Sequence, residues 1–170
     1  MSAPDAEISW WARVRTWFDV RFRSPAAIYG LIVFAAFVTI ADDHAESVWE
    51  ILLSATTSLV VFFIAHVFAH TLTEHADHGL RHATREGMRH GAGMLYASVP
   101  SVLALTYAGV TGMSIDDASE LSMWATFVVL FLLGYSAYRR RGARVFGRLV
   151  GGFATACLGV FIAILEYAIH

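Results

Sequence analysis

Long apolar runs alternate with short polar stretches along the chain after residue 24. About 20 consecutive apolar residues in a helix span the hydrocarbon core of a bilayer, which is about 30 Å thick. The runs therefore predict an all-α fold, an integral membrane helical bundle with about five transmembrane helices. The expected transmembrane domain covers residues 25–170, with spans at about 26–42, 47–72, 94–113, 120–138 and 145–169.

The first 24 residues have a different pattern, in which apolar positions recur every three or four residues among charged ones. Trp11, Val14 and Phe18 follow this spacing, which is typical of a helix that lies on a membrane surface. Residues 1–24 are therefore predicted to form an amphipathic helix on the cytoplasmic surface. Its basic side chains are expected to face anionic lipid: Arg13, Arg15, Arg21 and Arg23.

The composition supports a membrane location. Hydrophobic residues make up 57% of the chain and charged residues 15%, whereas charged residues make up about 25% of an ordinary soluble domain. The formal net charge is −2, and binding to nucleic acid is not predicted. The single cysteine, Cys157, excludes an intramolecular disulfide and a zinc site built on several thiolates.

The charged residues are segregated along the chain. All 12 cationic residues are arginines, and they lie in three segments, 13–23, 81–89 and 139–148. Acidic residues without a nearby cation occupy the loops around Asp42 and Asp116. Because arginine near the ends of spans is retained on the cytoplasmic side, we expect a multi-pass protein of the cytoplasmic (cell) membrane. Its N-terminus is predicted to be cytoplasmic and its C-terminus external.

The most informative polar cluster lies in the second half of the second span. At 100° per residue, four side chains fall within about 80° of one another on one helix face, namely His66, His70, Glu74 and Asp77. Of these, His66, His70 and Glu74 form a potential ligand set for a divalent transition metal. The same face is suited to relaying protons, because imidazole titrates near neutral pH. A third interpretation is that the histidines only make hydrogen bonds between helices.

Two other acidic residues lie within predicted spans, Glu50 near the external end of the second and Glu166 near the end of the fifth. An ionisable group at membrane depth is a functional hypothesis by default, so both are candidates for an ion or proton pathway together with the histidine face. No Ser-His-Asp or Cys-His grouping is apparent, and a Gly-x-Ser-x-Gly motif is missing. Catalytic residues are therefore not predicted, and an enzyme is not expected.

Two short motifs resemble small multi-pass membrane proteins of actinobacteria, Ile28-Tyr29-Gly30 in the first span and Ala65-His66-Val67-Phe68-Ala69 in the second. That resemblance implies a membrane bundle and no particular activity. The five-span layout with an amphipathic insert after the second span is also similar to iron and manganese transporters of the vacuolar iron transporter type. The chain departs from them in its first span, where residues 30–41 hold no acidic residue.

Together these patterns predict a small transport or channel-like protein of the cytoplasmic membrane. It is expected to handle protons or a divalent cation through the histidine and carboxylate face of the second span. A homo-oligomer is expected, because five thin spans enclose little interior. The alternative is a non-catalytic structural or signalling membrane module whose arginine-rich cytoplasmic segments bind anionic lipid or a partner protein. The lipid bilayer is the partner common to both hypotheses.

Overall fold

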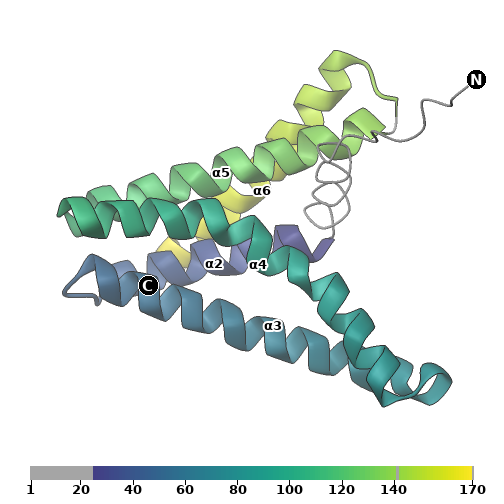
Figure 1. Ribbon diagram of the computed structural model, residues 1–170. Helices are drawn as coiled ribbons and strands as arrows, with labels where there is room; N and C mark the ends of the chain where they lie inside the picture. Colours follow the sequence, from purple (N-terminus) through teal and green to yellow (C-terminus); the bar gives the residue numbers. More distant parts are fainter. Residues whose placement is uncertain (1–24, 141, 170) are drawn as a thin grey trace, which may run out of the picture.

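The computed structural model describes residues 25–140 and 142–169, without the side chains of 75–78, 140, 162–163 and 165–169. This part of the chain folds into five helices and contains no strand (Figure 1), which confirms the predicted all-α membrane bundle. The amphipathic helix predicted over 1–24, with Arg13, Arg15, Arg21 and Arg23, lies outside the described residues. The helices are α2 (Pro25–Asp42), α3 (Val48–His78), α4 (Leu80–Thr111), α5 (Ile115–Arg140) and α6 (Val145–Ile169).

Four of these helices are long and apolar enough to cross a membrane. The qualifying segments are the whole of α2 and α4, Val48–Glu74 of α3 and Ile115–Arg139 of α5. Among the described residues of α6, the apolar segment is Val145–Phe161. By length and composition, the chain is a multi-pass membrane protein.

Glycines in the left-handed region of backbone space separate the longest helices. The φ angle is 76° at Gly79, 70° at Gly112 and 71° at Gly142, and residues with a Cβ atom rarely adopt such values. Gly112 also caps α4, because its N–H donates to the carbonyl of Ala108. Gly79 alone separates α3 from α4, and α4 joins the polar residues 80–92 to the apolar stretch that follows in one continuous helix.

Successive helices run in opposite directions, so the bundle has two chemically different ends (Figure 1). The turns at Gly79 and Gly142 lie next to arginine-rich segments and form the arginine-rich end; the turns after α2 and α4 form the acidic end. α3 and α4 make one hairpin and α5 and α6 a second, while α2 contacts all four of these helices. The tips of the two hairpins diverge at the arginine-rich end (Figure 1).

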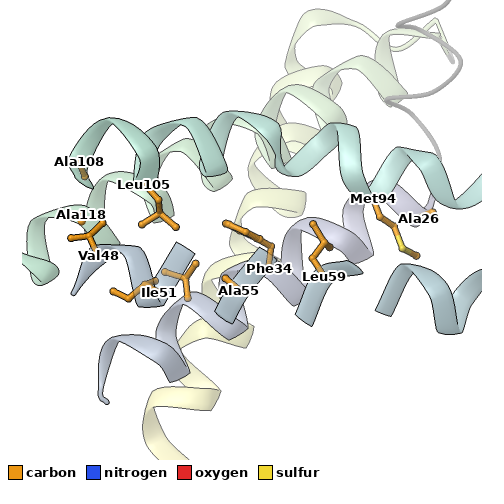
Figure 2. Packing of buried hydrophobic residues seen from close by; sticks show 11 residues of the cluster. Ala26, Phe34, Val48, Ile51, Ala55, Leu59, Met94, Leu105, Ala108 and Ala118 are labelled. Carbon is orange, nitrogen blue, oxygen red and sulfur yellow. The ribbon is translucent and has the colours of Figure 1, made fainter. Parts of the chain in front are cut away.

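The main hydrophobic core lies where α2, α3 and α4 meet. Phe34, Ile51 and Leu105 are fully buried there and project into the space between the helices (Figure 2). A second cluster joins α2 to α5 through the buried side chains of Leu31 and Leu130. α2 therefore ties the two hairpins together.

α4 changes direction along its length, and Pro100 lies inside it (Figure 1). Proline has no N–H group, so a proline inside a helix removes one backbone hydrogen bond and favours a bend. Beside it, the hydroxyl of Ser98 donates to the carbonyl of Leu95 at 2.9 Å. The Oγ atom of Ser101 lies 2.8 Å from Oγ1 of Thr126 in α5, which fixes the second half of α4 against that helix.

Candidate functional site

The two histidines of α3 lie where α4 approaches most closely at the arginine-rich end. A Cβ atom added to Gly87 of α4 would lie 3.3 Å from Cβ of His70, and one added to Gly91 would lie 3.2 Å from Cδ2 of His66. Glycines four residues apart allow a neighbouring helix to approach closely. The sequence thus places both imidazoles directly over the backbone of α4.

A third imidazole joins them from α4. The rings of His70 and His90 are stacked, with their centroids 5.3 Å apart and an angle of 21° between their planes. The sequence prediction did not include His90 in the site. Gly79 could have revealed this contact, because a helical hairpin that turns at Gly79 brings residues near 70 beside residues near 88.

The hydrogen bonds of the two stacked rings differ. Nδ1 of His90 lies 3.0 Å from the carbonyl oxygen of Glu86. A carbonyl only accepts hydrogen bonds, so this nitrogen carries the proton and Nε2 of neutral His90 keeps its lone pair. Nδ1 of His70 is buried and has no hydrogen-bond partner in the described part of the chain.

The other nitrogen of His70 faces a carboxylate. Its Nε2 atom lies 3.9 Å from Oε1 of Glu74, one turn further along α3, and the two side chains are 21% and 41% exposed. This separation permits an ion pair when the imidazole is protonated. The structure therefore places His66 and His70 against α4, and Glu74 beside His70. The side chain of Asp77 lies outside the described residues.

The stacking of His70 and His90 limits how these two rings could bind one metal ion. The lone pairs of imidazole nitrogens lie in the plane of the ring, so those of the stacked rings of His70 and His90 lie in two nearly parallel planes. Such lone pairs do not converge on one ion. Among the described side chains, no three His, Cys, Asp or Glu residues are placed to hold a metal ion.

The two remaining acidic candidates are not part of this cluster. Glu50 is exposed at the start of α3, where its Oε2 atom accepts a hydrogen bond from the backbone N–H of Glu46 at 2.9 Å. It precedes His70 by 20 residues, about 30 Å of helix, and its observed contact is that of a residue capping a helix start. The side chain of Glu166 in α6 lies outside the described residues.

A row of buried hydroxyl groups between α4 and α5 was missed by the sequence prediction. Ser122 donates to the carbonyl of Ser101 at 3.5 Å, and Ser119 donates to Oδ1 of Asp42 at 2.7 Å. Positions 119, 122 and 126 fall on one helix face, which is the signal that identifies such a row. The buried polar side chains described are Ser98, Ser101, Ser119, Ser122 and Thr126.

One further hydroxyl stands apart from this row. Thr56 lies about 80° from His66 and about 40° from His70 around α3, so the three side chains share one broad face of the helix. Its Oγ1 atom is buried and has no hydrogen-bond partner among the described residues. α3 therefore carries two buried polar atoms without a described partner, Oγ1 of Thr56 and Nδ1 of His70.

Comparison with known proteins adds no further assignment. No family model matches the chain, and no similar curated protein or solved structure was found. The chemistry of the α3–α4 interface is therefore the basis for inferring function.

Proposed function

We propose that this protein is a small multi-pass transport protein of the cytoplasmic membrane that conducts protons along the interface between α3 and α4. The observation that carries this proposal is the buried Nδ1 atom of His70, without a described partner, beneath a second stacked imidazole. A buried polar atom left without a partner costs about 1–3 kcal/mol of stability. Packing alone does not account for such a group at a helix interface.

The order of the side chains suggests the direction of the path. His90 is exposed and exchanges protons with water at the arginine-rich end. His70 is next on the path, with its Nε2 atom 3.9 Å from Oε1 of Glu74. His66 lies one helical turn, about 6 Å, closer to the middle of the membrane. Two charged rings at the observed separation would repel each other, so the stacked pair carries one proton at a time.

Beyond His66, the next polar atom on this face of α3 is Oγ1 of Thr56. The two residues are ten positions apart, or about 15 Å along the helix. Leu59 and Phe63 lie between them on the same face. The proposed path therefore requires water molecules to enter this apolar stretch, and the hydroxyl of Thr56 would be the first hydrogen-bonding group that they meet on the acidic side.

The orientation and assembly belong to the same proposal. The arginine-rich end faces the cytoplasm, as the distribution of arginine favours. The chain forms a homo-oligomer in which a second copy covers α3, because only 17% of the spanning window of α3 is buried within the chain, against 39% for α2 and for α4. Transport of a divalent cation through His66, His70 and Glu74 is the less favoured form, because these three described side chains are not placed to hold one metal ion together.

Proton flux into vesicles tests the proposal directly. The full-length protein is reconstituted into liposomes that contain a pH-sensitive dye, and flux is measured between pH 5 and pH 8 under an imposed potential. The native protein is expected to conduct with a flux that changes between pH 5 and pH 8, the range in which histidine side chains change their charge. His70→Gln is expected to lower flux at least about tenfold, which corresponds to about 1.4 kcal/mol in barrier height.

His82→Gln is the matched control. His82 also lies on α4 at the arginine-rich end, 3.5 Å from Glu86, but its side chain is 65% exposed. Flux through this variant is expected to stay within about twofold of the native value, a change of under 1 kcal/mol. Equal losses in both variants, or no proton flux through the native protein, would overturn the proposal. Flux that requires an added divalent ion, together with metal that co-purifies with the protein, would replace it with cation transport.

A second candidate function is favoured by a different observation. Arg81, Arg85 and Arg89 are exposed along one side of α4. In that alternative the protein is a structural or signalling module whose arginine-rich segments bind anionic lipid or a partner protein, and the histidines only pack. It predicts no flux in the vesicle experiment and no difference between His70→Gln and His82→Gln.

A further inference from the structure

Three arginines form a continuous stripe on the first half of α4. Arg81, Arg85 and Arg89 are spaced four residues apart, so they fall within about 80° of one another on the helix. All three side chains are exposed, whereas Ala83 and Gly87 on the opposite side of the helix are buried. We refer to Arg81, Arg85 and Arg89 as the basic stripe.

The basic stripe has no acidic counterpart among the described side chains. The nearest described carboxylate in sequence, Glu86, lies 3.5 Å from Nε2 of His82 and not within 4 Å of a described guanidinium group. An exposed row of three guanidinium groups without a described carboxylate within ion-pair distance attracts an external anion.

The position of the stripe on α4 indicates what kind of anion it meets. α4 continues without a break from Arg89 into the apolar stretch that begins near Met94, about 7.5 Å further along the helix. Met88, 52% exposed, lies beside the arginines on the outward side. Apolar and cationic side chains mixed on one helix face near the end of a span are typical of the headgroup layer of a membrane.

We propose that the basic stripe binds the phosphate groups of anionic lipids in the leaflet at the arginine-rich end. Guanidinium groups pair with phosphate through two parallel hydrogen bonds, which suits them to this role. The binding places the tip of the α3–α4 hairpin against the membrane surface. It is independent of whether protons move along the histidines.

The three arginines are expected to contribute unequally. Each turn of helix takes the next arginine about 6 Å further from the span, and electrostatic attraction to the surface falls off over a Debye length of about 8 Å at physiological salt. The expected order of contribution is therefore Arg89, then Arg85, then Arg81. Arg81 and Arg85 also line an open hollow of about 630 Å³ at the hairpin tip, and a small soluble anion bound in that hollow would give the opposite order.

Lipid retention by the full-length protein provides the test. The protein is purified in mild detergent, mixed with phosphatidylglycerol or phosphatidylcholine, and the bound lipids are counted by native mass spectrometry. Arg89→Gln is expected to weaken the binding of phosphatidylglycerol about fivefold, as for one arginine near an anionic surface. Arg81→Gln is expected to have the smallest effect, and phosphatidylcholine binding is expected to stay unchanged in every variant.

Arg144→Gln is the charge-matched control, because it removes one exposed arginine from the other turn at the same end. All three substitutions lie at exposed positions, and an unchanged unfolding temperature confirms that each variant is folded. An equal loss in Arg144→Gln and Arg89→Gln would indicate general charge attraction and overturn the stripe as a site. A largest effect at Arg81, with competition by inorganic phosphate, would assign the hollow to a soluble anion and overturn the lipid proposal.

Discussion

The two hairpins of the bundle bring their helices together by the same means but place different side chains at the contact. Between α5 and α6, a Cβ atom added to Gly152 would lie 2.8 Å from the ring of Phe131, and one added to Gly151 would overlap the ring of Tyr138. Between α3 and α4, the rings of both Phe63 and His66 lie over Gly91, and His70 lies over Gly87. Small residues allow close packing in both cases.

The difference lies in what the close packing costs each hairpin. A phenyl or phenol ring over a glycine gains van der Waals contact and leaves no ring nitrogen to satisfy. The imidazole of His70 leaves a buried nitrogen without a described partner, and this lowers stability by about 1–3 kcal/mol. The comparison indicates that the α5–α6 hairpin serves the fold, while the α3–α4 hairpin gives up stability at a place where function is proposed.

The largest expected effect concerns the side of the membrane on which the tips of both hairpins lie. Because both hairpin tips are arginine-rich, reporters inserted at Gly79 and Gly142 are expected to be active only in the cytoplasm. Reporters inserted at Gly112 or fused after residue 170 are expected outside. Each position is tested with two reporters, one active only in the cytoplasm and one active only outside, so that the location of the position is measured twice. Finding the two hairpin tips on opposite sides of the membrane would contradict the antiparallel bundle.

The next effect separates the two hairpins by their tolerance for an added methyl group. A Cβ atom at Gly134 of α5 would lie 2.5 Å from the carbonyl oxygen of Gly151, a backbone atom that cannot rotate away. Gly134→Ala is therefore expected to cost about 1–3 kcal/mol in the free energy of unfolding. Unfolding in mixed detergent micelles measures the difference.

Gly87→Ala is the matched variant in the α3–α4 hairpin. Its nearest contact, the carbonyl oxygen of Val67, would be 3.2 Å from the new Cβ atom. A shift of a few tenths of an ångström relieves this contact, and alanine has a higher helix propensity than glycine by about 1 kcal/mol. Stability is expected to stay within about 0.5 kcal/mol of the native value. A larger loss at Gly87 than at Gly134 would reverse the ranking of the two hairpins.

A smaller effect is expected when the α3–α4 contact is made to resemble the α5–α6 contact. His70→Phe keeps a ring over Gly87 and stacked near His90 but removes the unpartnered nitrogen. The variant is expected to gain about 1 kcal/mol in stability and to lose proton flux. A loss of stability instead would mean that the nitrogen has a partner in the membrane, and flux that survives would remove His70 from the pathway.

Much of the fold follows from the hydropathy of the chain. Apolar runs bounded by glycine and by charged turns determine where the helices lie, because a bilayer admits few other structures. The close contact between α3 and α4 was harder to predict. Periodicity along one helix places His66, His70 and Glu74 on one face, but the partner of that face depends on how α4 folds back at Gly79.

The site itself was predicted in part. His90 was missed because its role depends on a contact between helices, and a single helix pattern carries no such information. Glu50 was proposed because it lies within a predicted span; it is exposed and accepts a hydrogen bond from the N–H of Glu46, and its place on an ion pathway stays a prediction. Thr56 was missed because a threonine among apolar residues has no distinctive pattern, and only the absence of a described partner for its hydroxyl sets it apart.

The smallest expected effects come from two threonines with contrasting environments. Oγ1 of Thr126 lies 2.8 Å from Oγ of Ser101 and belongs to the hydroxyl row between α4 and α5. Thr126→Val is therefore expected to lower the free energy of unfolding by about 0.6 kcal/mol, the average for a hydrogen bond between membrane helices, and to leave proton flux unchanged.

Thr56→Val removes a hydroxyl that has no described partner, so the stability of this variant is expected to equal or slightly exceed the native value. If Thr56 supplies a hydrogen bond to water on the proton path, the same change lowers flux a few-fold while the fold is unaffected. Unfolding and flux measured on both variants distinguish these roles, because a hydroxyl that stabilises the fold changes only the first quantity and a hydroxyl on the path changes only the second. An unchanged flux in Thr56→Val would end the proposed path at His66.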